Sequence, residues 1–84
     1  MKSLAIRNYS TELRETVLAN HGPAAAKIFD AIKRYCDLTG GVCYATQQEI
    51  ADAIGYSRPT VNIYVNLLCD RGYLVDRRHS IGGG

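Results

Sequence analysis

The sequence lacks the features that mark a membrane-spanning, secreted or catalytic protein. No apolar run approaches the ~20 residues that a membrane span requires, and the N-terminus has no long signal-type core and no small-residue cleavage pattern. With 84 residues, the chain can build one modest core. No serine, cysteine or carboxylate pair has a base arranged to activate it. We therefore expect a single cytoplasmic domain over residues 1–84 that is not an enzyme.

The three cysteines do not form a disulfide framework or a usual zinc motif. Cys36, Cys43 and Cys69 are odd in number and include no Cys-x-x-Cys spacing. A zinc site of Cys36 and Cys43 with His21 or His79 can be drawn, but its spacing matches no usual pattern. Buried free thiols are the favoured interpretation. The sequence predicts no metal site and no cofactor.

Positive charge is scarce overall and unevenly distributed. The formal net charge is only +2. Residues 1–56 hold six Lys or Arg and six Asp or Glu, whereas residues 57–84 hold four arginines and two aspartates. An excess in the C-terminal third favours an anionic partner for that region. An excess of two charges is also compatible with an ordinary solvated face.

Helical spacing and helix-boundary residues predict four helices, over residues 10–20, 23–37, 46–54 and 57–72. Pro23 suits the first turn of the second helix, where its missing N–H costs nothing. Thr46 and Glu49 form the Thr-x-x-Glu pattern of a capping box at the start of the third. Gly55 ends that helix and Ser57 caps the next.

Two short segments are rich in strand-forming residues. Residues 42–45 lie between glycine and a helix cap, and residues 73–75 follow the glycine that ends the last helix. Both are expected to be brief strands. The predicted fold is therefore mainly α with a small β element.

The fourth predicted helix presents amides and an arginine opposite its apolar stripe. At about 100° per residue, one side carries Val61, Tyr64, Val65 and Leu68. The opposite side carries Pro59, Asn62, Ile63 and Asn66, with Arg58 at its margin. A guanidinium can donate two hydrogen bonds to guanine O6 and N7, and a carboxamide can pair with adenine N6 and N7. This face is therefore a candidate for reading bases, with Ile63 against a thymine methyl.

Polar residues at the two helix starts are candidates for holding phosphates. Hydroxyls and backbone N–H groups at a helix N-terminus suit phosphate oxygens. The predicted contacts come from Gln47, Gln48, Ser57 and Thr60.

Residues 46–74, TQQEIADAIGYSRPTVNIYVNLLCDRGYL, resemble the helix-turn-helix of bacterial transcription regulators. The cyclic-AMP-receptor and winged-helix repressor groups are most similar. The shared pattern runs from Ile50-Ala51 through Ile54-Gly55-Tyr56 and Ser57-Arg58-x-Thr60-Val61 to Leu68 and Gly72-Tyr73-Leu74. The resemblance implies a winged helix-turn-helix preceded by an additional N-terminal helix. It also assigns a base contact to Arg58.

A wing is expected over residues 73–84. Because Gly82-Gly83-Gly84 ends the chain at about the wing tip, two interpretations stay open: an incomplete wing, or one domain of a longer protein. Within the wing, the residues interpreted either as phosphate contacts or as a solvated basic turn are Arg77, Arg78 and His79.

The expected function is sequence-specific binding of double-stranded DNA in transcription regulation, as a repressor. A homodimer would read a palindrome. The helix over residues 10–20 is a candidate for the dimer contact, with packing on the rest of the domain as the alternative. Two alternatives remain open. The basic glycine-rich wing is also similar to that of phage and plasmid replication initiators, and winged helices also serve as protein-interaction modules. Salt dependence separates DNA binding from an apolar protein interface.

Overall fold

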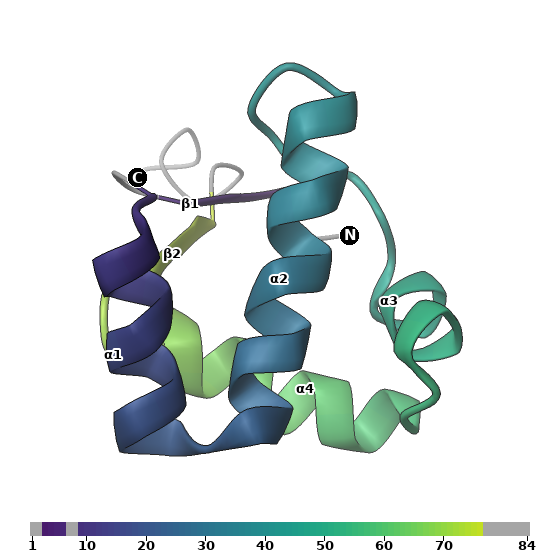
Figure 1. Ribbon diagram of the computed structural model, residues 1–84. Coiled ribbons are helices and arrows are strands. Elements are labelled where there is room, and N and C mark those ends of the chain that lie inside the picture. The colour runs from purple at the N-terminus through teal and green to yellow at the C-terminus, as the bar shows by residue number, and fades with distance from the viewer. Residues whose placement is uncertain (1–2, 7–8, 77–84) are drawn as a thin grey trace.

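The computed structural model describes residues 3–6 and 9–76 as four helices and a two-stranded antiparallel sheet (Figure 1). In chain order, the elements are β1 (Leu4–Ile6), α1 (Thr11–His21), α2 (Pro23–Leu38), α3 (Gln47–Ile54), α4 (Arg58–Asp70) and β2 (Leu74–Asp76). The expected fold class, mainly α with a small β element, is confirmed. The predicted ranges over 46–54 and 57–72 included Thr46, Ser57 and Arg71, which the structure places outside α3 and α4 as capping residues.

Helix α2 is the centre of the molecule, with α1 along one side, α3 along the other and α4 across its end (Figure 1). Its apolar stripe is fully buried at Ile28, Phe29 and Ile32. Val17 packs against this stripe from α1, and Leu13 is partly buried beside it. Because these residues serve the domain core, the apolar side of α1 is mostly used within the chain.

Side-chain caps explain where α1, α3 and α4 begin, whereas α2 begins at Pro23 with no side-chain cap. Ser10 Oγ accepts a hydrogen bond from the Leu13 N–H at 3.0 Å at the start of α1. At the start of α3, Thr46 Oγ1 accepts from the Glu49 N–H at 3.1 Å, and Glu49 Oε1 accepts from the Thr46 N–H at 3.0 Å. Ser57 Oγ accepts from the Thr60 N–H at the start of α4. These bonds satisfy N–H groups that the helices themselves leave free.

The sheet joins two segments far apart in the sequence. Ala5 pairs with Val75 in an antiparallel register, and Ile6 pairs with Leu74. Leu4 also exchanges backbone hydrogen bonds with Cys43, of 3.1 Å and 2.6 Å. The N-terminal segment therefore lies between β2 and the loop before α3.

One expectation about strands is corrected by this arrangement, and one strand was not anticipated. Residues 42–45 do not form a strand, because Cys43 alone makes an isolated bridge to Leu4. Strand β1 was not expected from its sequence. In the wing predicted over 73–84, residues 74–76 form β2, whose partner is β1. Residues 77–84, with Arg77, Arg78 and His79, lie outside the described residues.

Two of the three free thiols are buried in the core. Cys36 and Cys43 are 4% and 0% exposed, whereas Cys69 is half-buried. Burial raises the pKa of both the Cys36 and Cys43 thiols above the ordinary value. Both side chains are therefore neutral near pH 7 and act as small apolar core residues.

In the described part of the chain, no helix has the length and apolar character needed to cross a bilayer.

Candidate nucleic-acid interface

A tight left-handed turn sets the crossing of α3 and α4. Gly55 ends α3 with φ at 76°, a region that residues with a side chain rarely adopt. The Tyr56 N–H then donates to the Ala51 carbonyl at 2.9 Å. Ala51 is fully buried, so its small side chain lets the two helices approach closely. The turn and the alanine therefore fix where α4 begins and which way it points.

The packing of α4 leaves one of its sides in solvent. Its buried side consists of Val61, Val65 and Leu68, all fully buried. The residues predicted from the sequence to face outward are all exposed, namely Arg58, Pro59, Asn62, Ile63 and Asn66. The Ile63 side chain is 64% exposed, a high value for a branched apolar residue. The outward face of α4 is thus open to a partner along much of its length.

The start of α3 lies beside this face. Gln47 Nε2 donates a hydrogen bond to Asn62 Oδ1 at 3.0 Å, joining the first residue of α3 to the second turn of α4. Gln47 and Asn62 line a shallow hollow of about 260 Å³ together with Arg58 and Pro59. Four of the sequence-predicted site residues are therefore brought together at one place.

Other predicted residues are arranged differently. Gln48 Nε2 donates to Asp52 Oδ1 at 2.9 Å along α3, so Gln48 does not line the hollow. Ser57 Oγ donates to Thr60 Oγ1 at 2.9 Å, and Ser57 also caps α4. These side chains remain at the surface beside the helix starts, where they can exchange their present bonds for contacts with a phosphate.

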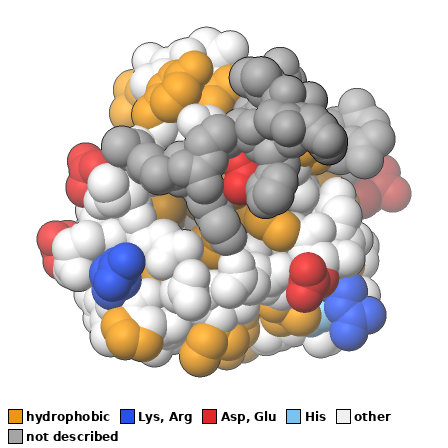
Figure 2. Space-filling view, turned by 180° about the vertical axis from the view of Figure 1, so that it is seen from behind, with side chains coloured by type: hydrophobic (Ala, Val, Ile, Leu, Met, Phe, Trp, Pro, Cys, Tyr) orange, Lys and Arg blue, Asp and Glu red, His pale blue; other side chains and the backbone are white. Residues whose placement is uncertain are grey.

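The surface around α4 is largely uncharged. Figure 2 shows the side of the molecule on which α4 lies, where uncharged groups predominate in the lower part and both basic and acidic side chains stand toward the margins. The outward residues Asn62, Ile63 and Asn66 carry no charge. On α3, Glu49 is engaged in the capping box and Asp52 accepts from Gln48. The face therefore offers hydrogen-bonding groups with Arg58 as the cation at its edge.

The structure adds a cation that sequence reasoning did not select. Lys27 projects from α2 with its ammonium 5.9 Å from the centre of the Tyr56 ring, at the corner between α3 and α4. The sequence offered no signal for it, because acidic residues nearby in the chain seemed to balance Lys27. Only the folded structure shows that the Lys27 ammonium lies at the corner between α3 and α4.

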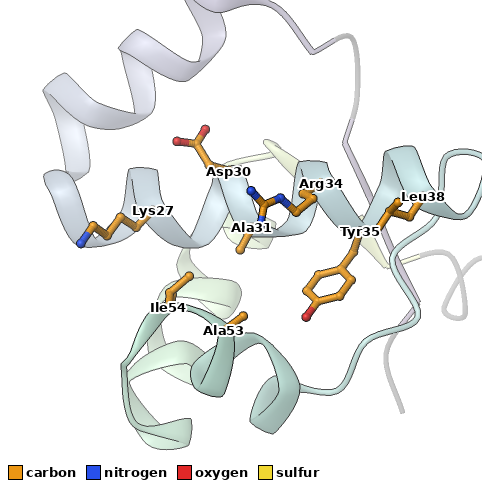
Figure 3. A pocket seen from close by; sticks show the side chains of 8 residues that line it. All are labelled: Lys27, Asp30, Ala31, Arg34, Tyr35, Leu38, Ala53 and Ile54. Atoms are coloured by element: carbon orange, nitrogen blue, oxygen red, sulfur yellow. The ribbon is translucent and has the colours of Figure 1, made fainter.

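A second hollow lies between α2 and α3, on the flank of the candidate interface (Figure 3). Its volume is about 670 Å³. Tyr35 points from α2 toward α3, while Ala53 and Ile54 face back toward α2. Lys27 lies at one end and Leu38, which is 74% exposed, at the other.

Among the described residues, no group of three or more His, Cys, Asp or Glu is placed to hold a metal ion.

Comparison with known families agrees with the arrangement of these helices. A family model described as a helix-turn-helix domain matches residues 22–74, more than half of the chain. The chain belongs to this helix-turn-helix family. The match covers α2, α3, α4 and the start of β2, whereas β1 and α1 lie outside it. No curated protein and no solved structure gives a significant match. Membership of the helix-turn-helix family suggests DNA as the partner.

Proposed function

We propose that this chain binds double-stranded DNA in a sequence-specific manner, with α4 in the major groove, and acts as a transcriptional repressor. The observation that carries the proposal is the two-sided character of α4. Val61, Val65 and Leu68 are fully buried, while Asn62 and Asn66 are exposed. The major groove is about 12 Å wide and admits a helix that presents such a face.

The proposed base contacts follow from the chemistry of the exposed side chains. Arg58 donates to guanine O6 and N7, and the carboxamides of Asn62 and Asn66 pair with adenine. Ile63 packs against a thymine methyl. Pro59, exposed beside Arg58, lines the same face at the helix start.

The proposed phosphate contacts surround this face. Gln48, Ser57 and Thr60 lie at the two helix starts, where backbone N–H groups and the helix dipole favour an anion. Lys27, beside the Tyr56 ring, supplies a further cation at the corner. Arg77, Arg78 and His79 are proposed to extend these contacts. Such contacts hold the helix in register on the duplex without reading sequence.

Repression requires only that the bound protein occupy its site on the DNA, and a DNA-binding face alone suffices for that.

We propose a homodimer, because two recognition helices related by a two-fold axis read a palindrome that one helix cannot specify. In a contact through α1, Leu18 is the available apolar group, 38% exposed, since Val17 is in the core.

A random-sequence selection tests this function. The full chain is mixed with random duplexes, the bound fraction is sequenced, and the affinity for the selected site is measured at several salt concentrations. We expect a palindromic site whose log K falls with log [salt] by about 0.9 per neutralised phosphate. Direct repeats instead of a palindrome would favour the replication-initiator alternative. Absence of any selected site would contradict DNA recognition and leave the protein-interaction alternative.

A further inference from the structure

We propose that Gln47 is a positioning residue that sets the orientation of the Asn62 carboxamide and so makes Asn62 specific for adenine. This inference rests on the proposed function, because it concerns how the same interface chooses its base. It assigns Gln47 a role different from the phosphate contact that its place at a helix start predicts.

The hydrogen bond between the two side chains carries the inference. Gln47 Nε2 donates to Asn62 Oδ1 at 3.0 Å, across 15 positions of sequence and from one helix to the other. Gln47 is half-buried, while Asn62 is exposed on the outward side of α4. Gln47 is therefore the inner partner of this bond, and Asn62 is the outer partner, whose amide can reach a base.

The bond distinguishes the two ends of a carboxamide. A side-chain amide turned by 180° exchanges its oxygen acceptor with its NH₂ donor, so a free Asn62 can present either pattern to a base. The donor on Gln47 favours the orientation in which Asn62 Oδ1 faces α3. In that orientation Oδ1 keeps a second lone pair and Nδ2 keeps both hydrogens. These are the groups that adenine N6 and N7 require.

The backbone on each side of this pair is held in place locally. Gln47 is the first residue of α3 and follows Thr46, whose capping box with Glu49 fixes the start of that helix. Asn62 lies one turn after Ser57 and Pro59, which fix the start of α4. A pair ordered before binding loses less side-chain entropy when DNA arrives.

Gln48 is the matched control that the chain offers. It has the same side chain at the same helix start, but it donates to Asp52 Oδ1 at 2.9 Å and lies outside the hollow that contains Asn62. Any effect that needs only an amide or a charge near the phosphates should appear at both positions. An effect on the orientation of Asn62 should appear at Gln47 alone.

The test compares base preferences of Gln47→Glu, Gln47→Met and Gln48→Glu in the full chain, with the wild-type site and its single-base variants as competitors. In Gln47→Glu, the carboxylate accepts a hydrogen bond from Asn62 Nδ2 and turns the amide over. We expect about a tenfold loss of discrimination for adenine at one position, within the range of a bidentate contact. Gln47→Met keeps the apolar stem but removes the donor, and should weaken the same preference less. Gln48→Glu should lower affinity without changing that preference.

Asn62→Ala identifies the position concerned, and thermal melting of each variant confirms that it folds. If the wild-type chain selects no duplex site, the proposed function fails. If it selects a site with an Asn62-dependent adenine, and Gln47→Glu and Gln47→Met keep that preference as Gln48→Glu does, DNA recognition stands and the role of Gln47 is overturned. A selected site in which Asn62→Ala alters no adenine also overturns it.

Discussion

Arg58 occupies the first turn of α4 and lines the same hollow as Gln47 and Asn62. Its side chain is exposed, and no ion pair within the described residues 3–6 and 9–76 involves it. A guanidinium in this position can direct two parallel N–H donors toward O6 and N7 of a guanine. The next residue, Pro59, favours a helical φ in the first turn and so keeps that start well defined.

We expect Arg58→Ala to weaken specific binding by about 1–3 kcal/mol and to relax the preference at one base pair. The measurement is competition between the selected site and its single-base variants. Arg34→Ala is the control, because Arg34 is also an exposed arginine but projects from α2. If Arg58→Ala selects the same sites with unchanged strength, Arg58 does not read a base.

Side-chain orientation on α4 was predictable, whereas contacts between helices were not. The 100° period alone separates Val61 and Leu68 from Asn62, and the burial of each agrees with it. The bond from Gln47 to Asn62 depends on how closely α3 and α4 cross. That crossing depends on tertiary packing around Ala51, which no local pattern specifies.

Helix α3 is short, only eight residues, and depends on its ends for stability. Isolated helices of this length are marginal in water, because few hydrogen bonds offset the cost of nucleation. The capping box at Thr46 and the left-handed Gly55 satisfy groups that the helix leaves free. The same cap orients Gln47, so stability and the geometry of the interface depend on one motif.

We expect Thr46→Ala to lower the free energy of unfolding by about 1 kcal/mol, because it removes the oxygen that accepts from the Glu49 N–H. Urea denaturation followed by circular dichroism measures the change. Thr46→Ser keeps the hydroxyl and should remain close to the wild type. Equal stability of Thr46→Ala and Thr46→Ser would show that the cap contributes little.

Helices were easier to foresee than strands because their signals are local. Ser10, Pro23 and Thr46 each mark a helix start within a few residues of sequence. Strand β1 has only three residues, and its hydrogen-bond partners are Cys43 and β2, far along the chain. A strand stabilised in that way leaves no pattern in its own neighbourhood, which is why it was missed.

The molecule as a whole depends on β1 as part of its core. Leu4 is 2% exposed and lies in the same cluster as Phe29, Val65 and Leu74. Its backbone binds Cys43 on one side, while β1 pairs with β2 on the other. Strand β1 thus lies between β2 and the loop that precedes α3, and it is hydrogen-bonded to both.

We expect Leu4→Ala to lower the free energy of unfolding by about 2–5 kcal/mol, the usual cost of a large-to-small change in a core. Leu38→Ala removes the same atoms from a residue that is 74% exposed, and should cost much less. Chemical denaturation of the two variants gives the comparison. Similar losses for both would mean that β1 is peripheral to stability.

The pairing of β1 with β2 also has a consequence for the order in which the protein forms during translation. Strand β1 leaves the ribosome before any of the described helices, yet its partner at Leu74–Asp76 is the last described element to be made. The helices, which form local contacts, can assemble first. Until β2 emerges, β1 therefore lacks its strand partner. During that interval the apolar side chains of Leu4 and Cys43 and the unpaired backbone groups of β1 are accessible to other chains.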